Sequence, residues 1–354
     1  MKTVAPGGVI GILGGGQLGR MLALAAARLG LQVHIYSDEE DAPAFQVTVL
    51  KTLARYDDEA ALAKFADGCD AITFEFENIP AASIAFLAAR KLVAPDARAL
   101  ALTQDRLAEK NFAVSLGLAT APFHAVDSAE DARVAFAKLG GAGILKTRRF
   151  GYDGKGQVKV TSADEAARAA EKFRAPCILE GLVDFSFEAS VIAARGADGS
   201  FAAFDVPENI HENHILRRSV VPSRLSPAQE EAAKVLARRI AEALDYVGVL
   251  AVELFVGKDG ALLVNEIAPR VHNSGHWTIE ACACSQFEQH IRAVAGWPLG
   301  DPARHGDAVM ENIIGAEADA WESLSRSGAL HLYGKREARM GRKMGHVTRL
   351  SPRK

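Results

Sequence analysis

Short apolar runs alternate with helix-forming runs in the N-terminal part of the chain, and this alternation constrains the fold more than any other feature. The predicted strands are 9–13, 32–36, 71–76 and 91–93, and the predicted helices are 17–29, 58–67 and 80–90. Strands that alternate with helices in this way form a parallel sheet covered by helices. We therefore expect a Rossmann-like lobe over residues 1–105, with one long helical run at 95–118 leading out of it.

The turn between the first strand and the first helix is rich in glycine. Gly14, Gly16 and Gly19 form a G-x-G-x-x-G pattern, and Asp38 follows nineteen residues later. This spacing is typical of a dinucleotide-binding turn, in which the helix N-terminus is free to hold an anion. A single G-x-G-x-x-G is weak evidence. An NAD-dependent oxidoreductase is therefore one interpretation, although the rest of the sequence offers no site for hydride transfer.

The composition argues against several classes of protein. A chain of 354 residues, 49% hydrophobic and 24% charged, is ordinary for a soluble protein of two or three lobes. The net charge of -3 argues against nucleic acid or an anionic membrane surface as the main partner. The longest uncharged apolar run, 21–27, is too short to span a bilayer, and the four cysteines form no CxxC pair. We expect a cytoplasmic protein with reduced thiols.

After the first lobe, the pattern indicates mixed and then antiparallel structure. The predicted elements are a helix at 128–139, a strand at 143–148, a loop at 149–157, strands at 177–183, 187–195 and 201–210, a helix at 226–244 and a hairpin at 247–270. The fold class is thus α/β and α+β. We divide the rest of the chain into a small lobe (106–184), an antiparallel-sheet lobe (185–300) and a C-terminal extension (301–354).

Two glutamates are predicted to face each other across the hairpin. Asp259-Gly260 is typical of a two-residue type I′ turn, and counting back from it places Glu253 opposite Glu266, with Cβ atoms about 5 Å apart. Like charges on a half-buried sheet are destabilising unless they are compensated, and Mg²⁺ is the simplest compensation. Asn265 adds a neutral oxygen ligand or a ribose contact. The alternative is a longer turn, a different register and two acids that face solvent.

A glycine-rich loop indicates a second anion-binding element. Gly151, Gly154 and Gly156 lie between two predicted strands, and Lys146 precedes them on the first strand. Glycines let the backbone N–H groups approach phosphates, and the lysine supplies a positive charge. The loop lacks the Gly-Lys-Ser/Thr of a P-loop. Together with the paired glutamates, it predicts a site for Mg²⁺ and ATP.

Five motifs in order resemble one enzyme family. They are GGGQLGRM, FEFENIP, RRFGYDGKGQ, LLVNEIAPRVHNSGHW and GRKMGH, spread over 14–346. The chain resembles the ATP-grasp superfamily and, within it, the 5-(carboxyamino)imidazole ribonucleotide synthases of purine biosynthesis. The resemblance implies an ATP-grasp fold of three lobes, a homodimer, and carboxylation of aminoimidazole ribonucleotide with ATP and bicarbonate through carboxyphosphate. We expect relatives to have a further closing helix after His346.

The resemblance also implies roles for individual residues at the ATP end. Glu253 and Glu266 resemble the Mg²⁺ ligands, Lys146 the contact to the α and β phosphates, and Glu188 the acid on the ribose. The other ATP-binding positions that it implies are Arg106, Gly151, Tyr152, Asp153, Gly154, Lys155, Gly156, Gln157, Glu180, Gly181, Leu182, Val183, His211 and Asn265. Of these, 151–157 resembles a lid and 180–183 the strand that offers backbone to adenine.

A further set of residues resembles the ribonucleotide and bicarbonate contacts. These substrate-binding positions are Gln17, Leu18, Glu75, Tyr152, Asp153, Arg270, His272, Asn273, Lys335 and Arg342. Lys146, Tyr152, Asp153 and Arg270 are the catalytic candidates. Asp153 is a candidate to orient or deprotonate the amine, and Tyr152 or the leaving phosphate is the alternative. On this interpretation, the anion at the glycine-rich turn belongs to the ribonucleotide, and Asp38 has no ribose to contact.

Three other interpretations remain open. An ATP-grasp transformylase that uses formate and a glycinamide ribonucleotide shares the lobes, but the FGYDGKGQ loop and the lack of a longer C-terminal segment disfavour it. A non-catalytic nucleotide sensor would be expected to lack Lys146, Glu253 or Glu266, and all three are present. A zinc site at His272 and His276 is disfavoured because no glutamate follows His272.

Overall fold

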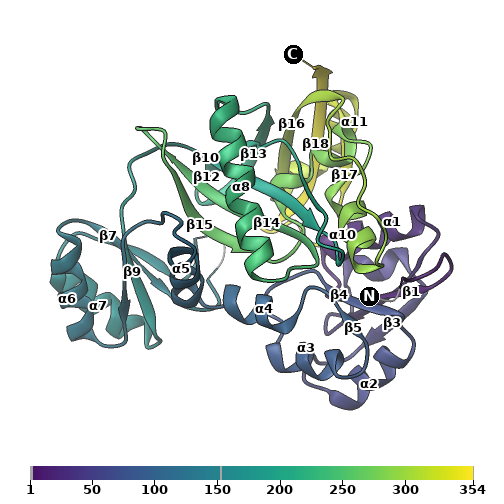
Figure 1. Cartoon of the computed structure of the whole chain (residues 1–354), viewed down its shortest axis with the longest axis horizontal. Coiled ribbons are helices and arrows are strands. Elements are labelled where there is room, and N and C mark those ends of the chain that lie inside the picture. Colours follow the sequence, from purple (N-terminus) through teal and green to yellow (C-terminus); the bar gives the residue numbers. More distant parts are fainter. Residues whose placement is uncertain (1–2, 152–153, 354) are drawn as a thin grey trace.

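The computed structural model describes residues 3–151 and 154–353 and contains three sheets (Figure 1). The first is parallel, in the order β3-β2-β1-β4-β5. Its strands are β1 (Val9–Leu13), β2 (Gln32–Ser37), β3 (Leu50–Leu53), β4 (Ala71–Phe74) and β5 (Leu92–Val93), accompanied by α1 (Gln17–Arg28), η1 (Pro43–Val47), α2 (Glu59–Asp67) and α3 (Ala81–Ala88). The predicted parallel lobe is confirmed, and β3 is an edge strand that the sequence pattern missed.

The predicted long helical run at 95–118 is wrong in one respect, because it is two helices. These are α4 (Ala97–Thr103) and α5 (Arg106–Ser115). Asp105 ends the continuity, since its carboxylate accepts hydrogen bonds from the backbone N–H groups of Leu107 (3.0 Å) and Ala108 (3.2 Å) at the start of α5. An aspartate that caps a new helix in this way satisfies N–H groups that would otherwise lack partners.

A small antiparallel sheet follows, in the order β6-β9-β7-β8. Its elements are β6 (Phe123–Val126), α6 (Ala129–Leu139), β7 (Gly143–Thr147), β8 (Gln157–Val160), α7 (Ala163–Phe173) and β9 (Cys177–Gly181). Both helices begin after a serine, Ser128 or Ser162, whose side chain caps the first turn. The two helices pack together beside the sheet, at the end of the molecule away from the first lobe (Figure 1).

The large sheet has nine strands in the order β15-β14-β10-β12-β13-β16-β18-β17, with β11 paired to β10. The strands are β10 (Phe185–Arg195), β11 (Phe201–Ala203), β12 (Glu208–Glu212), β13 (Ile215–Val221), β14 (Gly248–Gly257), β15 (Leu262–Ala268), β16 (Gly306–Ile314), β17 (Ala329–Leu332) and β18 (Lys343–Pro352). The predicted strand 201–210 is therefore two strands, with Pro207 between them. Pro207 has no N–H to offer a ladder.

Helices and short turns complete this part of the molecule. They are α8 (Pro227–Ala243), η2 (Asn273–Gly275), α9 (Thr278–Ala281), α10 (Gln286–Val294), η3 (Gly315–Ala320) and α11 (Trp321–Ser327). Strands from 301–354 extend the large sheet beyond β13, so the C-terminal extension shares a sheet with the hairpin lobe. The division at 105, 184 and 300 stays a proposal. Within the described residues, no helix combines the length and apolarity needed to cross a bilayer.

Candidate active site

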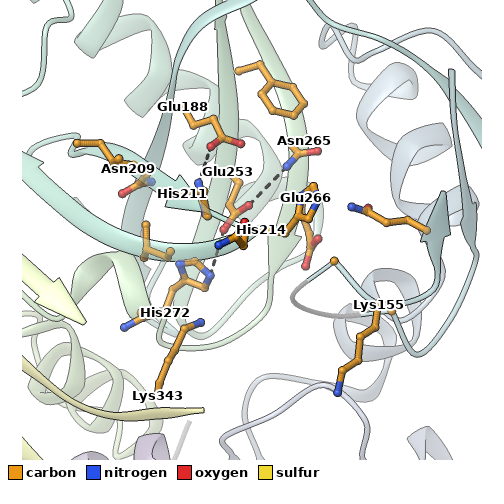
Figure 2. Close-up of a pocket in the computed structure, with 18 of the residues that line it drawn as sticks. Lys155, Glu188, Asn209, His211, His214, Glu253, Asn265, Glu266, His272 and Lys343 are labelled. Atoms are coloured by element: carbon orange, nitrogen blue, oxygen red, sulfur yellow. Dashed lines mark hydrogen bonds and ion pairs between the residues drawn. The ribbon is translucent and has the colours of Figure 1, made fainter. Parts of the chain in front are cut away.

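A cavity of about 1030 Å³ is walled by parts of all three lobes. The close-up of this cavity shows glutamates, histidines and Lys343 from different elements gathered around one space, with Lys155 apart from them (Figure 2). Of the residues predicted from sequence, the wall contains Gln17, Leu18, Glu75, Arg106, Lys146, Gly151, Gly154, Lys155, Gln157, Glu188, His211, Glu253, Asn265, Glu266, Arg270, His272 and Asn273. The structure thus gathers most of the predicted positions, from Gln17 to Asn273, around one cavity.

Glu253 and Glu266 are directly paired across β14 and β15, as the hairpin argument predicts. The predicted two-residue turn is nevertheless wrong. Gly257 N donates to Ala261 O (2.8 Å) and Gly260 has φ +84°, so the loop contains three residues, 258–260. The register is accordingly one residue out as far as Leu254, which pairs with Val264, and an irregularity next to Asn265 restores the predicted pairing.

The two paired carboxylates sit in different electrostatic surroundings. Burial, followed by the charge of Glu266, raises the pKa of Glu253 to about 7. Burial also acts to raise the pKa of Glu266, but Arg106 and then Arg270 outweigh it, and the pKa is lowered overall. Arg106 Nη1 lies 3.2 Å from Glu266 Oε2, and His272 Nε2 lies 3.2 Å from Glu253 Oε1. Burial, followed by the charge of Arg270, lowers the pKa of His272 well below its ordinary value, so Glu253 has a neutral imidazole beside it and Arg106 is the cation next to Glu266.

The donor set of this pair fits a divalent cation that is shared with a phosphate. Mg²⁺ is usually held by one or two carboxylates together with substrate phosphate oxygens and water. Residues 3–151 and 154–353 contain no group of three His, Cys, Asp or Glu placed to hold a metal. The pair of carboxylates, with the pKa of Glu266 lowered by its neighbours, therefore fits an ion that is also held by substrate phosphate. It does not form a site that the described residues close by themselves. Asn265 Nδ2 lies 3.5 Å from Glu253 Oε2 and borders the same pair.

Lys146 lies on β7 with its ammonium group 2.9 Å from Glu180 Oε2. Glu180, on β9, is buried and also pairs with Lys110 Nζ at 3.7 Å. None of the four described residues 180–183, which were predicted to contact adenine or ATP, lies on the cavity wall. Lys110 was missed in the sequence, although its position four residues after Arg106 places both on one face of α5.

Another part of the cavity wall is aromatic and contains a hydrogen-bonded acid and base. Glu188 Oε2 and His211 Nδ1 are hydrogen-bonded between β10 and β12 (Figure 2). Phe185 and Phe255 stack with ring centroids 4.8 Å apart, and Arg224 lies over the ring of Phe187 at 4.5 Å. All of these residues line the cavity. The aromatic residues were missed, because alternate phenylalanines on a strand are more often part of a core.

Glu75 occupies the glycine-rich turn with its own carboxylate. Its oxygens accept hydrogen bonds from the backbone N–H groups of Gly16 and Gly19, the latter at 2.6 Å. A Cβ atom at Gly14, which has φ +110°, would come 2.2 Å from Glu75 Cγ. The sequence predicted that this helix N-terminus is free to hold an anion. For the N–H groups of Gly16 and Gly19 this prediction is wrong, because Glu75 already accepts their hydrogen bonds. Asp38 is exposed at the end of the second strand and does not line the cavity.

The basic tail contributes a different residue from the two predicted. Among the described residues, the cavity wall includes Lys343 but neither Lys335 nor Arg342. Lys335 Nζ donates to Lys343 O at 2.8 Å, and burial lowers the pKa of Lys335 to about 8. Arg342 Nη1 donates to Glu337 O at 3.2 Å. Lys343 begins β18 and points toward His272 (Figure 2), so the GRKMGH motif was relevant and the position within it was missed.

Three further expectations concern the loop and the histidines. Tyr152 and Asp153 lie outside the described residues. Gly156 is outside the described wall, but its φ of +70° and the hydrogen bond from Thr147 N to its carbonyl (2.8 Å) shape the base of the loop. His276 is fully buried and lies beside Gln286, with Nε2–Nδ1 3.1 Å. It lies off the described cavity wall and does not join His272 there.

Comparison with known proteins gives matches along the whole chain. Three domain families match in order: the ribonucleotide synthetase preATP-grasp domain at 8–104, the ATP-grasp domain at 111–287, and the phosphoribosylaminoimidazole carboxylase C-terminal domain at 308–354. The N5-carboxyaminoimidazole ribonucleotide synthase of Brucella melitensis is 54% identical over 357 residues, covering 99% of this chain and 98% of that protein. The protein of that name from Bacillus subtilis is 42% identical, covering 98% and 92%.

Solved structures agree with these matches. An N5-carboxyaminoimidazole synthetase from Staphylococcus aureus complexed with ADP gives a TM-score of 0.94 at 38% identity, covering 99% of this chain and 95% of that one. A synthase from Aspergillus clavatus in complex with ADP and 5-aminoimidazole ribonucleotide gives 0.91 at 30% identity, covering 98% and 95%. The ATP-grasp fold predicted from the motifs is confirmed, and the likeness extends over all three sheets.

Proposed function

The chain belongs to the N5-carboxyaminoimidazole ribonucleotide synthase family of ATP-grasp enzymes, and from this premise we propose how its own residues divide the work. The enzyme joins a carboxyl group from bicarbonate to the amine of 5-aminoimidazole ribonucleotide at the expense of ATP, a step of purine biosynthesis. The observation that carries the assignment of roles is one shared cavity. It contains the Glu253–Glu266 pair, Lys146 and Glu75, each from a different part of the fold.

We assign the adenosine of ATP to the aromatic end of the cavity. Phe185 and Phe255 offer ring faces, and the side chains of Glu188 and His211 can accept and donate hydrogen bonds to the ribose hydroxyls. The phosphates then extend toward Lys146 and the glycine loop, where the small sheet approaches the hairpin. Lys146 is held by Glu180, which keeps its ammonium group at the wall. In this arrangement the triphosphate lies between the small sheet and the large one.

Glu253 and Glu266 are the residues that would hold Mg²⁺, with a neighbouring amide at Asn265. When bound, the ion neutralises phosphate charge and orients the terminal phosphoryl group. Arg106 now compensates Glu266 and His272 contacts Glu253, and both are in a position to turn toward a phosphate or a carboxyl group once the cation binds. The assignment of Mg²⁺ is supported by this donor set and by the two relatives solved with ADP.

The reaction is proposed to proceed in two steps. A bicarbonate oxygen attacks the γ phosphorus of ATP, the bond to the β-phosphate oxygen breaks, and carboxyphosphate and ADP form. The amine then attacks the carboxyl carbon, phosphate leaves, and the amine loses one proton to Asp153, Tyr152 or the departing phosphate. Arg270, which faces both Glu77 and the cavity, is placed to balance negative charge on the carboxyl group.

Glu75 and Lys343 define the ribonucleotide end. Gln17 and Leu18 follow the glycine-rich turn, and their backbone N–H groups lie beside the two that Glu75 already uses. Lys343 replaces Arg342 as the candidate phosphate contact on the cavity wall, with His272 beside it. Lys335 and Arg342 do not line the described cavity wall, and their predicted roles remain a proposal. In it, they add positive charge near the phosphate without touching it, and Lys335 also holds the backbone of Lys343.

The test is a substrate-omission assay. ADP and carboxylated product are measured with Mg-ATP, bicarbonate and aminoimidazole ribonucleotide, and then with each left out, using Glu266→Ala as the inactive control. Turnover that requires all three substrates and disappears in Glu266→Ala is the expected result. Activity only with formate and a glycinamide ribonucleotide would overturn the substrate assignment and keep the fold.

We also propose that the enzyme works as a homodimer in the cytoplasm. The resemblance to the family supports the dimer, and the four cysteines are buried free thiols, which suits a reducing compartment. Light scattering at micromolar concentration tests the oligomeric state, and a monomer mass at full activity would contradict it.

A further inference from the structure

The break between α4 and α5 is the place where the three lobes meet. Asp105 accepts hydrogen bonds from Arg148 at the end of β7, with Nη2–Oδ2 2.6 Å. Arg106 N donates to Arg148 O at 2.9 Å, and the Arg106 side chain donates to Glu266 Oε2 and to Gly151 O, each at 3.2 Å. The residue before them, Gln104, has no place in the family-based assignments above, and its contacts lead to a different part of the site.

The side-chain amide of Gln104 joins the small lobe to the loop that follows β4. Its oxygen accepts a hydrogen bond from Arg149 Nη2 at 2.7 Å. Its nitrogen donates to the carbonyl oxygens of Glu77 and Ile79, at 2.6 and 2.7 Å. A glutamine amide has two N–H donors and one carbonyl acceptor, so these three bonds use both donors and engage the acceptor. A hydrocarbon side chain at this position would break all three.

The loop held by Gln104 ends at the carboxylation site. Ile79 is fully buried in the first lobe and anchors the loop. Glu77 lies on the cavity wall, and its Oε1 is 2.8 Å from Nη2 of Arg270. A continuous chain of polar contacts therefore runs from Arg149, beside the glycine loop, through Gln104 and Glu77 to Arg270.

We propose that Gln104 is a positioning residue that couples the ATP-holding small lobe to Arg270, so that carboxyphosphate is captured by the amine instead of by water. The inference rests on the carboxylation proposed above. Carboxyphosphate has two fates. Either the amine attacks its carbon, phosphate leaves and a proton is lost, or water attacks and returns bicarbonate and phosphate with the loss of one ATP. A small displacement of Arg270 favours the second fate, because capture depends on the geometry of the reacting groups.

The test compares Gln104→Leu with wild type by counting ribonucleotide carboxylated per ADP released in a quenched single turnover. Wild type is expected to give a ratio near one, and Gln104→Leu about one half or less, with ADP release itself slowed by less than about threefold. Arg149→Leu is expected to lower the ratio as well, and the double variant to add little, because both act through one chain of contacts. Arg133→Leu removes an exposed pair with Asp164 in the same lobe and is the matched control.

Gln104→Glu separates the two ends of the contact chain and guards against simple misfolding. Glutamate keeps an acceptor for Arg149 but cannot donate to Glu77 O and Ile79 O, so its ratio is expected to fall. The melting temperature is expected to fall as well, because a carboxylate oxygen then faces two carbonyl oxygens, but a ratio counted per ADP released reports only the folded enzyme. A ratio of one in Gln104→Leu or in Gln104→Glu would overturn the proposal, whether or not the rate falls. A wild-type enzyme that releases ADP without carboxylating the ribonucleotide would instead overturn the proposed function, and the inference with it.

Discussion

Two arrangements of carboxylates lie on the cavity wall, and they are held in opposite ways. Glu75 receives the backbone N–H groups of Gly16 and Gly19, which cannot move away without unfolding the turn. Glu253 and Glu266 are contacted instead by side chains, those of His272 and Arg106, which a change of rotamer can move without unfolding the backbone. A carboxylate held by backbone is complete without a ligand, whereas one held by side chains can exchange them for a metal ion. The difference distinguishes a structural anion from a cation site.

This comparison also explains why the glycine-rich turn misleads. In a dinucleotide-binding protein the N–H groups at the helix start hold a pyrophosphate. Here, the Glu75 carboxyl group already accepts hydrogen bonds from two of these N–H groups, and the glycines are needed because they let it approach. The pattern in the sequence is the same, but the anion belongs to the protein itself.

The largest expected effect concerns the exchangeable pair. Glu266→Gln removes the carboxylate whose pKa is lowered by Arg106 and Arg270, and we expect ADP release to fall about 100- to 1000-fold. The measurement is the initial rate over a wide range of Mg²⁺ concentration. Glu130→Gln, on the exposed face of α6, is the control and should retain full activity. Activity within tenfold of wild type would show that the pair is not the cation site.

The next effect tests the fixed carboxylate. Gly14→Ala places a Cβ against Glu75 and strains a positive φ, so we expect a loss of roughly 3 kcal/mol in the free energy of unfolding. Gly30→Ala is the matched control, because Gly30 also has positive φ (+73°) but a Cβ there would meet no described atom within 4 Å. We expect it to lose only about 1 kcal/mol. Equal shifts in the midpoint of urea unfolding would mean that crowding at Glu75 is unimportant.

A smaller effect sharpens the comparison through pH. The raised pKa of Glu253, about 7 against an ordinary value of 4.5, means that the folded protein keeps a proton that the unfolded chain releases. Its stability contribution is therefore fully present below pH 4.5 and is lost as pH rises toward and through 7. For metal-free protein, the melting temperature of wild type should fall more between pH 5 and pH 8 than that of Glu253→Gln. Parallel curves for the two proteins would refute the assignment.

The smallest effect is expected at an exposed carboxylate, which is neither held by backbone N–H groups like Glu75 nor placed on the cavity wall like Glu253 and Glu266. Asp57 pairs with Arg55 at 2.8 Å, but both side chains are largely exposed, at 61% and 81%. Exposed pairs of this kind contribute little, since water screens them. Asp57→Asn should leave the melting temperature and the rate unchanged. A clear drop in either would mean that burial is not what separates the three cases.

The sequence was sufficient for features that depend on local pattern. The parallel lobe follows from the alternation of strands and helices, and the pairing of Glu253 with Glu266 follows from the hairpin. The pairing was predicted correctly only because two deviations from the predicted hairpin cancel. The turn is one residue longer than predicted, and the irregularity at Asn265 compensates for it, so the pairing is right although the turn is not.

The features that could not be predicted depend on contacts distant in sequence. Residues 95–118 look like one helical run, and the aspartate that caps the second helix, Asp105, is held in place by Arg148, more than forty positions away. Glu75 reaches the glycine-rich turn from the end of β4, a strand that is next to β1 in the sheet but about sixty residues away in the sequence. The choice between Arg342 and Lys343 depends on where β18 starts, because neighbouring residues on a strand face opposite ways.

The nine-stranded sheet has a consequence for how the enzyme is made. β13 pairs with β16, which is followed in the chain by β17 and β18. Until residues 306–352 have left the ribosome, one edge of β13 lacks its partner, and unpaired edges of this kind invite aggregation. Lys343 also reaches the cavity only when β18 has joined the sheet. The nascent chain thus completes its largest sheet and its active site in the same late event, so a polypeptide arrested at about residue 300 would be both inactive and exposed to chaperones.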